Sequence, residues 1–275
     1  MRFLCRNGQI KRLQIYLVPM RKENFLYSIL TICLFAFCSC STDTASNVKL
    51  LKKTISTSET GTSVITVFTY VADEIGSIDD ANTHVDFTYS DGLIVKKVTT
   101  DKESSLVETV EYTYNAGELI RAESLNKYKI NYIYNSDNTI SYQKMKIVSE
   151  DQEVKEFHGI LFFENENLIK DERILDNTAT GTVSKYNLNF DYDSKKNPLF
   201  NIVGYKKLLD CNQAISTNNS LIITENTSID KDDQIISSAK MYKNSFTYDS
   251  DGYPKEQVCE PTIFNSGYVK IQYFY

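Results

Sequence analysis

The most regular feature of the chain is a pair of aromatic residues two positions apart, which recurs from residue 68 to the C-terminus. This spacing puts both rings on one face of a β-strand, while the residue between them, often Thr, faces the opposite side. We expect the rings of successive repeats to stack on that face and to stabilise the sheet. The pairs are Phe68/Tyr70, Phe87/Tyr89, Tyr112/Tyr114, Tyr132/Tyr134, Phe190/Tyr192 and Phe246/Tyr248, with a weaker copy at 161–163 and a last copy at 273–275.

Tight-turn residues follow most of these pairs and define a repeating unit. Ser90-Asp91-Gly92 and Asn115-Ala116-Gly117 are two examples, and a second apolar stretch begins after each of them. Gly, Asn and Asp tolerate the positive φ that a tight hairpin turn requires. The unit is therefore predicted to be a β-hairpin. Successive pairs start 19 to 29 residues apart, except for an interval about twice as long from 190 to 246, in which residues 221–223 mark a degenerate copy.

The repeated hairpins predict an all-β fold. Roughly seven to nine of them make an antiparallel meander, and no stretch after residue 40 has the sustained 3.6-residue period of a helix. One hairpin cannot bury its ring face alone, whereas neighbouring hairpins together can. A sheet of this length has to curl or close to protect its edges, so we expect a strongly curled sheet or an open or closed barrel.

The first 39 residues are predicted to be a signal segment. A basic start at 20–22 precedes an apolar run over 25–37. The run is too short to span a bilayer, because a spanning helix needs about 20 apolar residues. The residues before Met20 make an unusually long front for a signal, which suggests that translation starts at Met20.

The end of this segment, Phe37-Cys38-Ser39-Cys40, resembles the processing site of a bacterial lipoprotein. The resemblance implies that Cys40 receives the lipid and becomes the mature N-terminus, so that the protein contacts a membrane through this anchor. Cys38 is a competing site, and a plain cleaved signal peptide is the alternative. Residues 40–48 are then the lipidated cysteine and a polar tether, and residues 49–275 a single β-repeat domain.

Charge narrows the class of partner. Residues 1–39 hold six of the 30 basic residues and one of the 36 acidic residues, so the remainder carries a net charge of −11. Such an acidic protein lacks the basic footprint that phosphates require, which argues against nucleic acid. The 19 Tyr offer stacking surfaces for a glycan, although the chain has no Trp, and a protein ligand is the other possibility.

Two cysteines, Cys211 and Cys259, remain beyond the signal segment and Cys40. In an oxidising envelope they could form a disulfide, or they could be two separate buried thiols. The chain has no CxxC motif and no Cys/His cluster. We therefore expect neither a structural metal nor a cofactor.

A family resemblance rests on the repeat. The units at 87–98 and 246–258 resemble the tyrosine-aspartate (YD, or Rhs-like) repeats, and Tyr248-Asp249-Ser250-Asp251-Gly252 is the nearest copy. Together with the lipoprotein signal, the Tyr-rich meander is similar to uncharacterised Gram-negative envelope lipoproteins with a porin-like β fold, over most of residues 60–275. The resemblance implies a place in the cell envelope, anchored in the outer membrane, and it supports the fold far better than any reaction.

Recognisable catalytic chemistry is sparse. Neither His84 nor His158 lies at a catalytic spacing from a Ser, Cys or carboxylate. Acidic pairs such as Glu164/Glu166 leave a glycosidase open, although acids in turns are usually solvated. Three functions therefore stay open. The first is a non-catalytic binding or structural module of the envelope, the second a carrier of a lipid or other apolar ligand inside a half-open barrel, and the third a glycan-acting enzyme.

Overall fold

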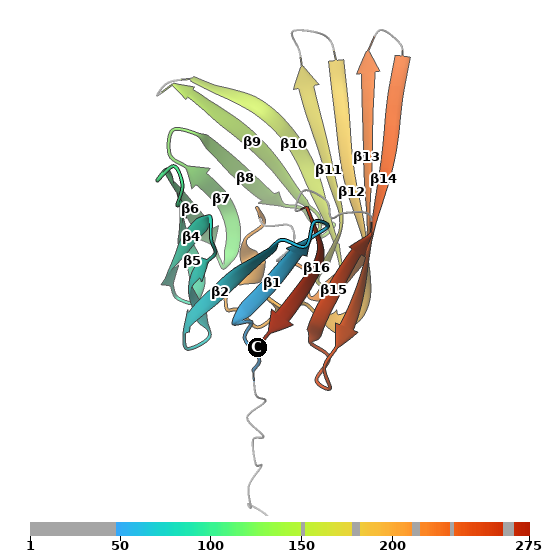
Figure 1. Cartoon of the computed structure of the whole chain (residues 1–275). Coiled ribbons are helices and arrows are strands. Elements are labelled where there is room, and N and C mark those ends of the chain that lie inside the picture. Colours follow the sequence, from blue (N-terminus) through green and yellow to red (C-terminus); the bar gives the residue numbers. More distant parts are fainter. Residues whose placement is uncertain (1–47, 150–151, 178–181, 211–214, 232–233, 261–266) are drawn as a thin grey trace, which may run out of the picture. The chain divides into compact units, whose positions relative to one another are not determined.

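Sixteen antiparallel strands form a closed barrel in the computed structural model (Figure 1). The structure describes residues 48–149, 152–177, 182–210, 215–231, 234–260 and 267–275. Each strand pairs with its neighbours in sequence, and the pairing of β1 (Lys53–Ser58) with β16 (Tyr268–Phe274) closes the ring. The predicted all-β meander of hairpins is confirmed, and closure pairs the edges that an open sheet would expose.

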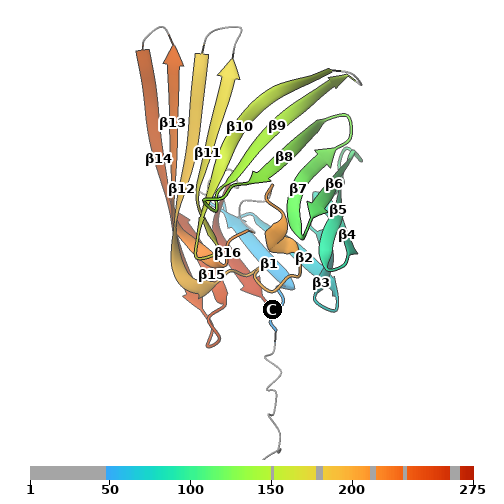
Figure 2. The ribbon, with the colours of Figure 1, turned by 180° about the vertical axis from the view of Figure 1, so that it is seen from behind.

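The strands differ in length around the barrel. Strands β10 to β14 have 11 to 15 residues and the other strands 6 to 10, so the wall is higher on one side (Figure 2). Among the described residues, no helix is long and apolar enough to cross a membrane. The other strands are β2 (Ser63–Val71), β3 (Glu74–Asp79), β4 (Thr83–Ser90), β5 (Leu93–Asp101), β6 (Val107–Asn115), β7 (Glu118–Ser124), β8 (Tyr128–Tyr134), β9 (Ile140–Ser149), β10 (Gln152–Glu164), β11 (Asn167–Asn177), β12 (Thr182–Lys196), β13 (Asn218–Lys231), β14 (Gln234–Tyr248) and β15 (Pro254–Glu260).

The predicted turn residues occupy two-residue hairpin loops. Asp91 and Gly92 have φ of 53° and 72°, and Ala116 and Gly117 have φ of 50° and 78°. Positive φ at both central residues matches the right-handed twist of the flanking strands. These turns lie at the ends of β4 and β6, directly after the aromatic pairs, as the repeat predicts.

A β-bulge recurs at one position of the repeat. The register shifts immediately before the Tyr of the pair, at Thr69/Tyr70, Thr88/Tyr89, Thr113/Tyr114 and Thr247/Tyr248. A bulge interrupts the ladder of hydrogen bonds and increases the local twist of the strand. It therefore changes the direction of the Tyr side chain and leaves nearby backbone groups without a strand partner.

The Tyr hydroxyls supply those partners. Tyr114 Oη donates a hydrogen bond of 2.8 Å to the backbone oxygen of Ile94 on the preceding hairpin. Three other hydroxyls donate to backbone oxygens in the same way: Tyr70 to Leu51, Tyr192 to Leu168 and Tyr275 to Pro254. Two hydroxyls instead accept from a backbone N–H: Tyr89 from Ile75 and Tyr134 from Leu119. The linked backbone residues are buried, so each hydroxyl satisfies a polar group that water does not reach.

The aromatic rings point into the barrel and form much of its core. The expectation that rings of successive repeats stack directly is wrong, because the second strand of each hairpin lies between them. Rings instead contact within one pair, as in Phe190 and Tyr192 at 6.3 Å between centroids, or reach the intervening strand, as in Tyr132 and Tyr142 at 6.1 Å.

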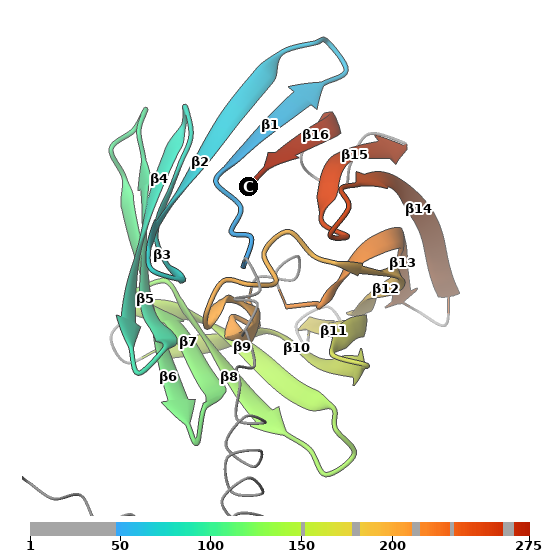
Figure 3. The same cartoon turned by 90° about the horizontal axis from the view of Figure 1, so that it is seen from below.

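The segment between β12 and β13 folds into the barrel, and we call its described residues, 197–210 and 215–217, the plug. It contains the short 3₁₀ helix η1 (Tyr205–Lys207), which lies inside the ring of strands (Figure 3). Ile202, Leu208, Leu209 and Ile215 of the plug are buried in the core. The plug explains the long interval between the repeats at 190 and 246, and residues 221–223 lie in β13.

Candidate binding cavity beside the plug

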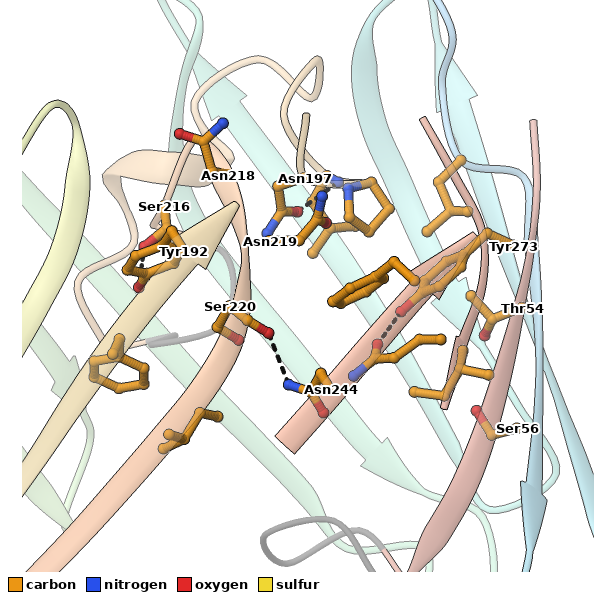
Figure 4. A pocket seen from close by; sticks show the side chains of 18 of the residues that line it. Thr54, Ser56, Tyr192, Asn197, Ser216, Asn218, Asn219, Ser220, Asn244 and Tyr273 are labelled. Carbon is orange, nitrogen blue, oxygen red and sulfur yellow. Dashed lines mark hydrogen bonds between the residues drawn. The ribbon is translucent and has the colours of Figure 1, made fainter. Parts of the chain in front are cut away.

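A cavity of about 260 Å³ lies between the plug and the wall formed by β1, β2 and β12 to β16. The polar side chains labelled in Figure 4 come from β1, β12, β13, β14, β16 and the plug. The volume is near the lower end of the range for small-molecule sites. The lining consists of Leu51, Thr54, Ser56, Phe68, Phe190, Tyr192, Asn197, Pro198, Leu199, Ser216, Asn218, Asn219, Ser220, Ile223, Asn244, Phe246, Gln257, Ile271 and Tyr273.

The lining carries no Asp, Glu, Lys or Arg among the described residues. Phe190 and Tyr192 form a stacked ring pair in the wall. Phe246 also lines the cavity and stacks on Tyr248, which lies outside the lining, at 6.0 Å between centroids. These rings and the aliphatic side chains offer an apolar surface, with amides and hydroxyls distributed among them. An uncharged ligand is the class that such a surface accommodates without leaving a charge unpaired.

Most polar groups of the cavity are held by neighbouring atoms of the protein. Asn244 Nδ2 donates to the backbone oxygen of Ser220 at 2.8 Å, and the backbone N–H of Leu199 donates to Asn197 Oδ1 at 2.8 Å. Tyr192 Oη lies 2.8 Å from Ser216 Oγ, and burial raises the pKa of Tyr192 to about 12. The cavity is therefore a preformed surface rather than a set of free polar groups.

Three side chains from β15 and β16 form a chain of hydrogen bonds at the cavity wall. Tyr273 Oη donates to Gln257 Oε1 at 2.5 Å, and Gln257 Nε2 donates to the Cys259 sulfur at 3.2 Å. Burial raises the pKa of the Cys259 thiol to about 11, so the sulfur is a neutral thiol at neutral pH. Nothing in this arrangement activates the cysteine as a nucleophile.

The acidic pairs that are compatible with a glycosidase lie near the ends of three different strands, β10, β12 and β14, and have separate partners. Asp249 and Asp251 both bind the Lys49 ammonium, at 2.6 and 2.5 Å. Glu166 pairs with Lys206 of the plug at 3.2 Å, and Tyr248 Oη donates to Asp193. Within the described ranges, no three His, Cys, Asp or Glu side chains gather as metal ligands would.

The predicted site residues are distributed unevenly. The ten repeat aromatics, Phe87, Tyr89, Tyr112, Tyr114, Tyr132, Tyr134, Phe190, Tyr192, Phe246 and Tyr248, line the inner face of the barrel, and three of them border the cavity. Cys259 is buried, whereas Cys211 and Cys40 lie outside the described residues, so the disulfide and the lipidation stay predictions. Sequence reasoning missed the plug residues, for which the long interval after residue 190 is the available signal.

Comparison with known proteins supports the fold. No protein-family model and no curated protein matches the chain. A porin-like protein from Bacteroides vulgatus is similar in structure, with a TM-score of 0.53 and 14% sequence identity over 82% of this chain and 98% of that one. A porin-like protein from Bacteroides uniformis aligns with a TM-score of 0.48 and 13% identity over 81% and 95% of the two chains. The likeness to the Bacteroides vulgatus protein confirms the expected porin-like β fold at the level of the fold alone.

Proposed function

We propose that the protein is a non-catalytic binding module of the cell envelope, held in the outer membrane by a lipid on Cys40. Its barrel faces water and encloses a small uncharged ligand in the cavity beside the plug. The observation that carries this proposal is the combination of a plugged interior with an uncharged, ring-lined cavity. A plug packed into the core counts against an open, water-filled channel through the barrel.

The outer face of the barrel supports contact with water rather than lipid. Thr69 and Ser77 share a hydrogen bond of 2.7 Å across β2 and β3, and Lys270 pairs with Glu256 at 2.7 Å across β16 and β15. A lipid-facing barrel instead needs a continuous apolar band about 25 Å tall. Outward apolar side chains are instead distributed over many strands, for example Ile65 on β2, Ile133 on β8 and Met241 on β14, and polar side chains lie between them.

The cavity can be tested with an uncharged dye that fluoresces on leaving water, N-phenyl-1-naphthylamine. We expect the purified protein to bind the dye, and Ser56→Phe, which fills the cavity from β1, to weaken binding about tenfold or more. Ser245→Phe on the exposed face of β14 is the matched control and should leave binding unchanged. If both variants bound the dye as tightly as the wild type, the dye would not bind in this cavity and the proposed ligand site would be wrong.

The anchor has its own test. Cells that express the full chain are labelled with radioactive palmitate, and we expect label in the wild type and in Cys38→Ala but not in Cys40→Ala. Unchanged labelling of Cys40→Ala contradicts the assignment of Cys40. Loss of label in Cys38→Ala, with label retained in Cys40→Ala, would show that Cys38 carries the lipid.

A carrier of a lipid or other apolar ligand is the second candidate. The aliphatic side chains of the lining, Leu51, Ile223 and Ile271, support this candidate because they extend the apolar surface of the rings. Displacement of the bound dye by decanol, but not by maltose, would favour the carrier, whereas displacement by maltose would favour a glycan-binding module. A glycan-acting enzyme draws no support from the site, because the acidic pairs do not converge on the cavity.

A further inference from the structure

A second cavity has a volume of about 290 Å³, and its lining shares no residue with that of the first. Its wall comes from β5, β8, β9, β10 and β11, and Leu209 and Asp210 of the plug contribute to it. The lining contains three basic and two acidic side chains. Its chemistry therefore differs from that of the uncharged cavity beside the plug.

Aromatic rings and cations alternate across five consecutive strands at this wall. The Lys144 ammonium of β9 lies 4.8 Å from the ring centroid of Tyr128 on β8 and 5.6 Å from that of Phe157 on β10. The Arg173 guanidinium of β11 lies 5.4 Å from the Phe157 centroid and 5.7 Å from that of Tyr186 on β12. We call these five side chains the cation–aromatic ladder, and each contact is within the range of cation–π attraction.

The acids of this cavity are less accessible than its cations. The Asp171 side chain is 0% exposed, whereas that of Arg173, which binds it at 2.6 Å, is 29% exposed. The Asp210 side chain is 9% exposed, lies 3.6 Å from Lys97, and accepts a hydrogen bond of 3.0 Å from Tyr112 Oη. A molecule in the cavity therefore meets positive charge before negative charge.

Arg173 is held in place and keeps hydrogen-bonding capacity. Its Nε and Nη2 donate to Asp171, and its Nε also donates to Tyr142 Oη at 3.0 Å. Tyr142 Oη in turn donates to Asp171 at 2.5 Å. Among the described residues, the Nη1 group has no hydrogen-bond acceptor, so a guanidinium edge stays available for an anionic group.

From this arrangement we infer that the ladder is a binding site for an acidic sugar of the hexuronate kind. Two further rings of the lining, Tyr132 and Tyr142, provide aromatic surface against which a sugar ring packs, and Arg173 and Lys144 of the ladder bind its carboxylate. The three cations and two acids of the lining leave one positive charge, which the Glu156 carboxylate outside the lining balances. A monoanionic carboxylate can take the place of Glu156 at equal charge, whereas a phosphate ester with a charge of about −1.5 to −2 cannot. The Glu156 carboxylate, 3.2 Å from Lys144, is exchanged for that of the ligand.

Calorimetric titration of the full-length protein with D-glucuronate and with D-glucose tests the inference. We expect D-glucuronate to bind at least about tenfold more tightly than D-glucose, because a charge-assisted hydrogen bond contributes more than a neutral one. Higher salt should weaken D-glucuronate binding. Equal affinities for the two sugars, or no binding of D-glucuronate at millimolar concentration, would overturn the inference.

Two Lys→Gln variants locate the site. Lys144→Gln should lower D-glucuronate affinity about tenfold, and Lys144→Arg should restore most of it. Lys170→Gln is the matched control, because Lys170 pairs with Glu172 and lies 5.3 Å from the Phe162 ring on the opposite face of the neighbouring strands. A loss of affinity in Lys170→Gln equal to that in Lys144→Gln would contradict a site inside the barrel.

The variants also separate this site from the cavity beside the plug. Lys144→Gln should leave binding of N-phenyl-1-naphthylamine unchanged, and Ser56→Phe should leave D-glucuronate binding unchanged. Thermal unfolding of each variant checks that it is folded. If Ser56→Phe abolished D-glucuronate binding in a folded protein, the two cavities would be one site and the inference would fail, whatever the outcome for the dye.

Discussion

The hydroxyl of Tyr114 donates a 2.8 Å hydrogen bond to the backbone oxygen of Ile94, a residue with 0% exposed surface. Ile94 is also the register partner of Tyr89, the corresponding tyrosine of the preceding repeat. These two repeats are thus joined at the bulge. The Tyr of the repeat is consequently required for its hydroxyl and not only for its ring, since Phe fills the same volume without the bond.

Tyr114→Phe is expected to destabilise the barrel by about 1–3 kcal/mol, because the substitution leaves a buried carbonyl without a donor. Urea unfolding followed by tyrosine fluorescence measures the change in the free energy of unfolding. Thr113→Val, on the outer face of the same strand, is the control and should change stability by no more than about 0.5 kcal/mol. An unaltered stability of Tyr114→Phe would show that the bond adds nothing.

Gly159 is predicted to be intolerant of a methyl group. A Cβ atom at this position would lie 2.7 Å from the Tyr142 ring and would also collide with the backbone oxygen of Glu172. We expect Gly159→Ala to cost about 1–3 kcal/mol through overpacking. At Gly76 the nearest atom to such a Cβ is Thr69 Oγ1 at 3.5 Å, so Gly76→Ala should stay within about 1 kcal/mol of the wild type. Thermal unfolding of both variants decides the comparison.

The repeat made the hairpins predictable because its signals are local. Alternation of Phe87 and Tyr89 specifies which face is buried, and Asp91-Gly92 specifies where the chain reverses. Barrel closure could not be deduced in the same way. The contact between β1 and β16 joins the two ends of the described chain, and the sequence pattern is the same for a curled open sheet.

The plug and both cavities depend on contacts between distant residues. Tyr89 Oη donates to the backbone oxygen of Val203 at 3.0 Å, a pairing across 114 positions, and a Cβ on Gly204 would lie 2.9 Å from the backbone oxygen of Gly92. The sequence marks this region by the absence of a repeat where one is due. Asp171 and Arg173 likewise look like ordinary solvent-facing strand positions in the sequence, and only the barrel structure shows that they face the interior.

Leu208→Ala tests whether the plug is part of the folded core. Leu208 is 0% exposed, and its truncation should cost about 2–5 kcal/mol if the plug unfolds together with the barrel. Leu106→Ala is the control, since Leu106 is 72% exposed and should matter little. The hydrogen-exchange rates of backbone amides in the plug and in the strands test this directly. Fast exchange at Leu208 beside slow exchange at Ile94 would indicate a plug that opens independently of the barrel.

A pH dependence follows from His84 on the outer face. Its Nδ1 lies 2.6 Å from Asp79 and its Nε2 3.1 Å from Asp86, while Lys102 also binds Asp79. The hydrogen bond to Asp79 is the main cause that raises the pKa of His84 above its ordinary 6.5, and the bonds from His84 and Lys102 lower the pKa of Asp79 below 3.8.

The two shifts define a window of pH. Because the pKa of His84 is raised on folding, its contribution is complete below pH 6.5 and disappears as the pH rises through the folded-state pKa. Asp79 has a lowered pKa, so its contribution is present above 3.8 and disappears as the pH falls. His84→Gln should therefore lower the melting temperature more at pH 5.5 than at pH 8.5, whereas Thr88→Val on the same face should act equally at both. Equal effects of His84→Gln at the two pH values would mean that the imidazole is not charged in this cluster.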